Sequence, residues 1–362
     1  MNRELATLKR MFPLGLVEPD HLLQLGESFR GASSTVSPFT SGIDATQRRS
    51  YPAAMQNISR RAFLQSVAAA SGASAVVVPS FRSAAGAQGV NEWGVPVLDT
   101  HMHPRATPEA HIAHLDGAGV TMAVLLTGAA VEDRAKQAVA AYPSRFIRFA
   151  AIDVMQPNSV EYLRAALEGG AKWFGEIKSQ VAAAGPEMQR LYALAAELNV
   201  PIVIHFQEFS PPGGPGTFNT GFKKFDAMLK AFPKTTFVGH ADGFWANVSA
   251  DYAEETSYPT GRIKPGGATD RFLGEYPNLY ADISANSGNN FLTRDPEFAA
   301  RFIERHQNKL ICGSDCPCPD GRGGATGRCI ARATLTQLKQ IATPEIFRKI
   351  VWENGPRVLK IA

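Results

Sequence analysis

The sequence predicts an α/β fold, a (β/α)8 TIM barrel that begins near residue 95 and continues to the end of the chain. From that point, short apolar runs alternate with longer segments of helical pattern. Repeated strand–helix alternation is typical of a parallel sheet, and eight such units fit a barrel. No GxGxxG motif follows the first strand, which argues against an open, doubly wound sheet.

The predicted strands are the short apolar runs at 95–101, 120–126, 146–152, 173–178, 201–205, 235–240, 278–283 and 309–314. The predicted helices lie between them, at 131–141, 158–169, 186–198, 220–231, 295–306 and 329–341. Long loops follow strands five and six, and the second of them (241–267) carries several aromatic residues that are expected to pack. In a barrel, the chemistry lies where the strands end.

Composition limits the function classes. The chain has 362 residues, of which 44% are hydrophobic and 19% are charged, and its formal net charge is +4. This is enough for a large core, and the small charge with no dense basic run argues against nucleic-acid binding. No membrane span is expected once the export signal described next is removed.

The first 87 residues have a different character from the rest. Arg60 and Arg61, the weakly apolar run 65–79 and the small-residue triplet 85–87 follow one another in the order of a twin-arginine export signal. We therefore predict a signal at 55–87 and a periplasmic or exported protein. Residues 1–54 are predicted to be a disordered extension or an over-called start, and the barrel domain is predicted to span 88–362.

Histidines cluster at the predicted strand ends. His101 and His103 close strand one, His205 closes strand five and His240 closes strand six, which places four of the eight histidines at strand ends. Side chains alternate along a strand, so His101 and His103 should face the same way and form half of a divalent metal site. Asp315 closes strand eight and adds a carboxylate.

Other polar residues need separate interpretation. Strand four carries Glu176 and Lys178, which alternation places on one face, and strand seven carries Asp282. His111 and His114 lie on the first helix, where we expect them to be solvated.

All four cysteines fall between residues 312 and 329. An oxidising compartment permits a disulfide, and we favour Cys318–Cys329 across the glycine-rich loop, although sequence alone does not determine connectivity. A structural zinc site is the alternative, but the cluster lacks paired CxxC spacing.

These motifs together resemble the amidohydrolase superfamily. The resemblance rests on HxH in strand one, the histidines that end strands five and six, and the Gly-Ser-Asp that ends strand eight. Residues 278–284 (Asn-Leu-Tyr-Ala-Asp-Ile-Ser) and 353–359 (Glu-Asn-Gly-Pro-Arg-Val-Leu) are similar to its amidohydrolase-related (type 2) branch, which includes aminocarboxymuconate semialdehyde decarboxylase. The resemblance covers residues 95–361.

The resemblance implies that one divalent cation, with Zn²⁺ favoured, is bound by His101, His103, His205 and Asp315. It also implies that Asp315 takes the proton of the attacking water, while His240 orients the water or stabilises the oxyanion.

Some relatives hold two metals on a carboxylated strand-four lysine, so a second metal is expected if Lys178 is carboxylated. Glu176 resembles the strand-four glutamate of another two-metal branch. With one metal, Lys178 would bind an anionic substrate group or pair with Glu176.

The sequence therefore predicts an exported metal-dependent hydrolase that acts on an ester, lactone or amide carbonyl of a small molecule. Non-oxidative decarboxylation of an unsaturated or aromatic acid is the alternative enzyme activity, because it would use the same ligands. A non-catalytic metal- or ligand-binding barrel is the alternative from another class. A small-molecule substrate is the expected partner, and assembly into a homo-oligomer is left open.

Overall fold

The computed structural model describes residues 91–361. The predicted extension at 1–54 and export signal at 55–87 lie outside the described residues, so both stay predictions. Within residues 91–361, no helix has the length and apolar character needed to cross a membrane.

Eight parallel strands form the centre of the described chain. They are β1 (Leu98–Met102), β2 (Met122–Leu125), β3 (Phe146–Arg148), β4 (Phe174–Ile177), β5 (Ile202–His205), β6 (Phe237–His240), β7 (Leu279–Ile283) and β8 (Leu310–Cys312). They make a three-stranded sheet, β1-β2-β3, and a five-stranded sheet, β4-β5-β6-β7-β8.

Hydrogen bonds cross both seams between the two sheets. At one seam, the Ala150 amide donates to the Trp173 carbonyl at 3.0 Å and the Gly175 amide donates to the Ala150 carbonyl at 2.9 Å. At the other, the Asp315 amide donates to the His101 carbonyl at 2.7 Å. The predicted (β/α)8 fold is confirmed, since each strand has a neighbour on both sides.

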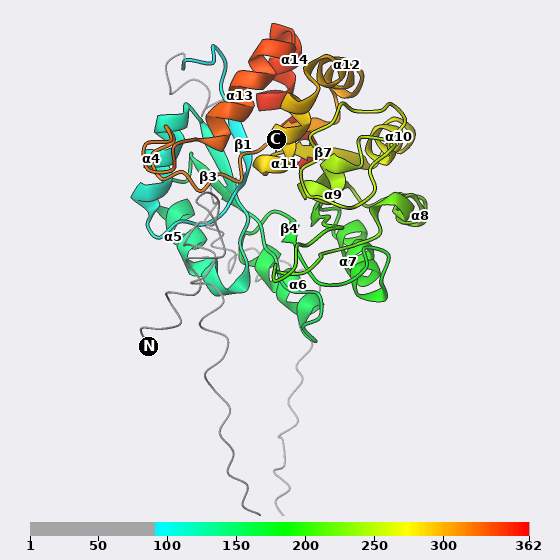
Figure 1. The fold of residues 1–362 in the computed structure, drawn as a ribbon. Helices are drawn as coiled ribbons and strands as arrows, with labels where there is room; N and C mark the ends of the chain where they lie inside the picture. Colours follow the sequence, from blue (N-terminus) through cyan, green and yellow to red (C-terminus); the bar gives the residue numbers. More distant parts are fainter. Residues whose placement is uncertain (1–90, 362) are drawn as a thin grey trace, which may run out of the picture. The chain divides into compact units, whose positions relative to one another are not determined.

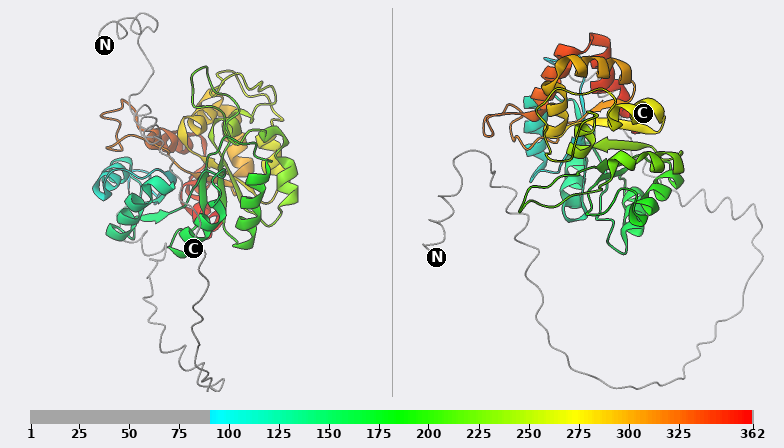
Figure 2. Two further views of the ribbon diagram at one scale, coloured as in Figure 1. Left: turned by 90° about the horizontal axis from the view of Figure 1, so that it is seen from below. Right: turned by 45° about the vertical axis from the view of Figure 1, so that its right-hand side comes forward.

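The helices surround these strands, as the labels from α4 round to α14 show in Figure 1 and as two further views show in Figure 2. They are α4 (Pro108–Ala118), α5 (Glu132–Ala141), α6 (Ser159–Glu168), α7 (Pro186–Glu197), α8 (Asp226–Ala231), α9 (Ala241–Ala246), α10 (Ala268–Glu275), α11 (Ala285–Arg294), α12 (Pro296–His306), α13 (Ile330–Ile341), α14 (Pro344–Arg348) and α15 (Asn354–Val358). Short helical turns are η2 (Ala129–Val131), η3 (Phe222–Lys224) and η4 (Lys349–Glu353).

Two sequence predictions about these elements are corrected. The helix expected at 220–231 is divided into η3 and α8, and the loop expected at 241–267 begins with α9. A six-residue helix is too short to show a helical period in sequence. Its Phe244 and Trp245 are buried, and the Trp245 indole donates to the Asp282 carbonyl at 3.0 Å, so these aromatics pack as expected.

The packing of the strands determines which side chains face the barrel axis. Val203 and Val238 belong to an apolar cluster drawn from β1, β2, β5, β6 and β8. Because residues two apart on a strand face the same way, His205 and His240 point to the same side as these valines. The interior therefore changes from apolar packing to imidazoles at the carboxyl ends of β5 and β6.

A close backbone contact ties α4 to the loop that follows β8. A Cβ added at Gly117 would lie 1.8 Å from the Asp320 carbonyl oxygen and 3.2 Å from the Gly321 Cα. We expect Gly117→Ala to lower the free energy of unfolding by about 1–3 kcal/mol, because backbone must move to admit the methyl group. Denaturant unfolding measures this change.

Gly128→Ala is the matched control, since nothing lies within 4 Å of a Cβ added there. It should change stability by no more than about 0.5 kcal/mol. Equal unfolding midpoints for the two variants would show that the contact at Gly117 is not tight.

Candidate metal centre

The carboxylate of Glu176, at the end of β4, lies among four imidazoles. Its Oε2 is 3.4 Å from His103 Nε2 and 3.9 Å from His101 Nε2. Its Oε1 is 3.3 Å from His240 Nε2 and also contacts His205 Nδ1. Oε2 therefore faces the two imidazoles at the end of β1, and Oε1 faces one imidazole from β5 and one from β6.

A second carboxylate holds two of these rings from behind. Asp282 Oδ2, on β7, is 2.6 Å from His101 Nδ1 and 3.3 Å from His240 Nδ1. Ser284 Oγ donates to the same Asp282 oxygen at 2.8 Å and lies 2.9 Å from His240 Nδ1. A carboxylate on one ring nitrogen leaves the other nitrogen available to a metal or substrate, so Asp282 and Ser284 are positioning residues.

Whether these residues fit a cation can be judged from the buried ring nitrogens that face the centre. His101 Nε2 and His240 Nε2 are buried and have no hydrogen-bond partner among the described residues. His101, His103 and Asp315 offer ligand atoms that all lie within 4.8 Å of one another, and His101, Glu176 and His240 form a second group of this kind. Imidazole and carboxylate donors suit a divalent ion such as zinc, so the residues fit the implied metal.

The structure brings together three of the four predicted ligands. His103 Nε2 is 3.3 Å from Asp315 Oδ1, and both belong to the group that contains His101. His205 is outside that group; its Nδ1 contacts Glu176 and its Nε2 is 3.3 Å from Gln207 Oε1. Ligation by His205 stays a prediction.

Lys178 lies at the edge of the centre rather than inside it. Its side chain is exposed, and its Nζ lies 5.0 Å from the centroid of the Phe218 ring. No ion pair joins it to Glu176 among the described residues. Strand β4 ends at Ile177, so the alternation that predicted a shared face for Glu176 and Lys178 no longer holds there.

Sequence reasoning gave Glu176 only a tentative role and left Asp282 and Ser284 without one. The signal for Asp282 was present, since it is a carboxylate near the end of a predicted strand. What was missing was its distance from His101, which lies 181 positions away in the chain.

The charges of the centre are strongly coupled. Burial alone would raise the pKa of Glu176, but the surrounding imidazoles of His205, His103 and His240 hold it well below its ordinary value. Burial lowers the pKa of His103, but hydrogen bonding to Glu176 and the charge of Asp315 outweigh burial and raise this pKa to about 9. Burial likewise opposes the effect of Asp282 and Glu176, which raise the pKa of His240 to about 10.

These pKa values predict that metal uptake releases protons at pH 7. A metal ligand must be deprotonated, whereas His103 in the metal-free protein holds its proton up to about pH 9. We expect one proton released if His103 ligates and His240 does not, and two if both ligate. Apparent metal affinity should therefore rise with pH up to about 9 to 10.

The stability of the metal-free protein should change in the opposite direction. A raised histidine pKa stabilises the fold fully below the unfolded value of about 6.5, and this contribution is lost as pH rises through about 9 and 10.

The release of protons on metal uptake is measured by calorimetry of metal binding in two buffers of different ionisation enthalpy, which counts the protons. His306→Gln, which alters a pair with Asp270 on other elements, is the control, and absence of proton release at pH 7 would contradict the prediction.

Two expectations outside the centre are wrong. All four cysteines are free, and Cys329 faces Cys316 with the sulfurs 3.8 Å apart, whereas Cys318 Sγ donates to Asp320 at 3.0 Å. The predicted Cys318–Cys329 disulfide is therefore absent, because the loop turns Cys318 toward its own glycine-rich segment. His111 and His114 are buried rather than solvated, because the first helix packs them inward.

Comparisons with known proteins agree with this architecture. The sequence profile of the family described as Amidohydrolase matches residues 96–361. No curated protein matches the chain significantly.

Several solved structures are similar to this chain. A probable 2-pyrone-4,6-dicarboxylic acid hydrolase from Acinetobacter baumannii, with citric acid bound, is 17% identical with a TM-score of 0.50, over 74% of this chain and 100% of its own. Dihydroorotase from Campylobacter jejuni is 15% identical with a TM-score of 0.47, over 74% and 83%. A TatD homologue from Escherichia coli is 17% identical with a TM-score of 0.47, over 74% and 98%. At 17% identity, the similarity to the Acinetobacter baumannii structure supports the fold alone.

Proposed function

Because this chain belongs to the amidohydrolase family, we propose that it is a metal-dependent hydrolase that adds water to an ester, lactone or amide carbonyl of a small organic molecule. Family membership makes the chain an enzyme of this class; the substrate class is the proposal. The observation that carries it is the convergence of imidazoles and carboxylates on one point from the ends of β1, β4, β5, β6 and β8.

His101, His103, Glu176 and Asp315 are the residues that would hold a divalent cation, with His205 as a further candidate. When bound, such a cation polarises a carbonyl oxygen and lowers the pKa of water. Zn²⁺ is the favoured ion. Glu176 offers one oxygen to each pair of imidazoles, so the centre has donors for one cation or for two.

Asp315 is placed to accept the proton of the attacking water. Burial would raise its pKa, but the charges of His103 and His101 lower it, so the carboxylate is ionised at neutral pH. Its side chain is 30% exposed and can meet a substrate, whereas the Glu176 side chain is 7% exposed. A general base in contact with the reacting water contributes typically about 10²–10⁴-fold to the rate.

His240 is placed to stabilise the oxyanion. Asp282 and Ser284 hold its Nδ1, and its Nε2 faces the centre without a hydrogen-bond partner among residues 91–361. Asp282 and Glu176 outweigh burial and raise the pKa of the metal-free ring to about 10, and a proton on Nε2 would be donated to a developing negative charge. In this role His240 is not a metal ligand.

The rim of the centre favours a substrate with an anionic group. Burial is the largest influence on the pKa of both His205, which it lowers, and Asp242, which it raises. The exposed Lys178 is close enough that its charge acts on both groups in the lowering direction. A carboxylate on the substrate would meet this ammonium group while its carbonyl lies against the imidazoles. Lys178→Ala should then raise KM for carboxylated substrates more than for neutral ones.

The experiment is a substrate screen of lactones, esters, amides and aryl carboxylates, followed by turnover in H₂¹⁸O. Label in the product carboxylate supports hydrolysis. Release of CO₂ without incorporation of solvent oxygen would replace hydrolysis with the decarboxylase reading, and turnover that persists unchanged after complete metal removal would contradict both.

A further inference from the structure

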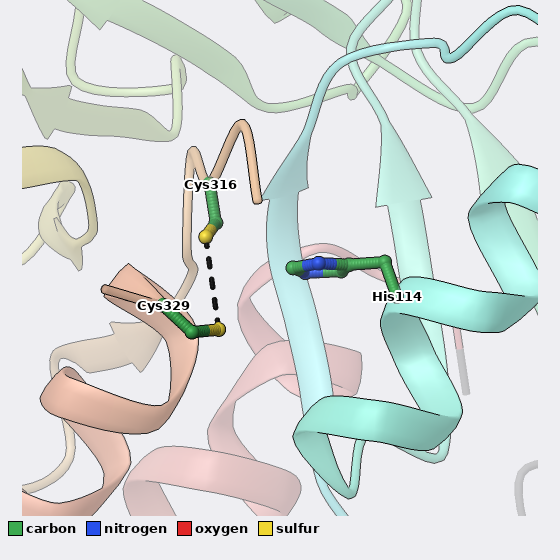
Figure 3. Close-up of side chains that lie close together, drawn as sticks. All are labelled: His114, Cys316 and Cys329. Carbon is green, nitrogen blue, oxygen red and sulfur yellow. Dashed lines mark hydrogen bonds between the residues drawn. The ribbon is translucent and has the colours of Figure 1, made fainter. Parts of the chain in front are cut away.

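A cluster of metal-binding side chains, separate from the centre described above, lies between α4 and the loop that follows β8. His114 comes from α4, Cys316 follows Asp315 in the loop, and Cys329 precedes α13. Their ligand atoms all lie within 4.8 Å of one another, and Figure 3 shows the three side chains directed toward one point. All three residues are buried.

We propose that His114, Cys316 and Cys329 form a second metal site, which binds one thiophilic divalent cation of the Zn²⁺ type. This site goes beyond the proposed hydrolase function and does not depend on it.

The separation of the sulfurs matches a shared metal. Cys316 Sγ and Cys329 Sγ are 3.8 Å apart. Two thiolates bound to one tetrahedral zinc at about 2.3 Å each lie about 3.8 Å from each other, which is the edge of the tetrahedron. A disulfide would need the same atoms about 2.05 Å apart.

The imidazole is already oriented as a ligand. His114 Nδ1 donates to the Cys318 carbonyl at 2.6 Å, which leaves the lone pair on Nε2. That Nε2 is buried and has no hydrogen-bond partner in the described part of the chain. Burial and the nearby charge of Arg105 lower the pKa of His114 to about 4, so the ring is neutral, as a ligand must be.

The surroundings also suit sulfur in its anionic form. The Ile330 amide donates to Cys316 Sγ at 3.2 Å, and the Arg105 guanidinium donates to the Cys316 carbonyl at 2.8 Å. Two thiolates and a neutral imidazole balance the charge of a divalent cation, whereas two buried thiolates without one would be costly. Cys318 is not a ligand, since its sulfur donates to Asp320 and accepts from the Gly323 amide at 3.1 Å.

The consequence is mechanical. One cation would tie α4 and the start of α13 to the residue directly after Asp315. Asp315 has a φ of 46°, a backbone conformation that L residues seldom adopt, so its position depends on what holds the loop. A metal at Cys316 would hold the carboxylate of the proposed hydrolytic centre in place from outside the barrel.

The test uses the full chain, purified under reducing conditions and loaded with Co²⁺ as the probe. A site with thiolate ligands gives a sulfur-to-cobalt charge-transfer absorption, whereas the barrel centre offers only nitrogen and oxygen and gives none. We expect this band in the wild type, its loss in Cys316→Ser and in Cys329→Ser, and its retention in Cys318→Ser, the matched control on the same loop. Zinc content should fall by one equivalent only in the first two variants.

Thiol titration of the wild type, in denaturant and without reductant, tests the proposal even where a variant fails to fold. Four thiols after metal removal, together with the band, support the site. Two thiols and no band would show that two of the cysteines form a disulfide and would overturn the proposal, as would four thiols with no band. Loss of the band in Cys318→Ser would refute the ligand assignment. None of these readings requires hydrolase activity.

Discussion

Asp315→Asn should lower kcat on the best substrate by about 10²–10⁴-fold, the usual contribution of a general base. The amide keeps the size of the side chain but cannot accept the proton of the attacking water. It also removes the negative charge that lies 3.3 Å from His103 Nε2, so metal affinity should weaken as well. Steady-state kinetics at saturating metal separates the two effects, because only the loss of the base persists there.

Asp133→Asn is the control for this prediction, since Asp133 is exposed on α5. It should leave kcat, KM and metal content unchanged. If Asp315→Asn retained the wild-type kcat at saturating metal, Asp315 would not be the general base. A chain that turns over no substrate in the screen, as wild type or as variant, would instead be a metal- or ligand-binding barrel.

Glu176→Gln should have the largest effect on metal binding. The substitution keeps the shape of the side chain and removes the one charge that faces four imidazoles. Removing groups that merely support metal ligands already weakens binding by about 10–100-fold, so loss of a central carboxylate should exceed that range. Competition with a chelator of known affinity measures the change.

A second readout ties this effect to the charge of Glu176 rather than to packing. Glu176 contributes to the raised pKa of both His103 and His240, so both pKa values should fall in Glu176→Gln. NMR titration of the metal-free histidines reports this shift. Glu304→Gln, at an exposed position on α12, is the matched control, and unchanged metal affinity in Glu176→Gln would remove Glu176 from the centre.

The proposed site at His114, Cys316 and Cys329 also contributes to the measured metal content. If the second site holds zinc, total metal per chain counts both sites, so the metal content of Glu176→Gln must be compared with that of Cys329→Ser. A loss confined to the barrel centre leaves the cobalt–thiolate band intact. The two centres can therefore be emptied and measured separately.

Local pattern was sufficient to predict the barrel. Short apolar runs and helical segments alternate over neighbouring residues, and that alternation is visible without knowing which strands meet. The same pattern placed His101, His103, His205, His240 and Asp315 at strand ends, because parallel strands in a barrel bring their carboxyl ends to one face. These features depend on sequence neighbours and on one rule of topology.

Tertiary structure decided which side chains contact one another in the metal centre. Register shifts within β1, between Asp99 and Met102, and within β4, between Phe174 and Ile177, change which side chains turn inward, and alternation alone does not show them. They accompany the placement of Glu176 among the imidazoles, with Lys178 outside at the rim.

The sequence by itself therefore determined the fold and the histidines that its strands present. Only the tertiary structure decided that Asp282 holds two of those rings and that His114 faces Cys316 and Cys329 rather than solvent. The physical reason is distance along the chain. Contacts between residues about two hundred positions apart depend on how whole strands and helices pack, and such packing leaves no periodic trace in the residues that make the contact.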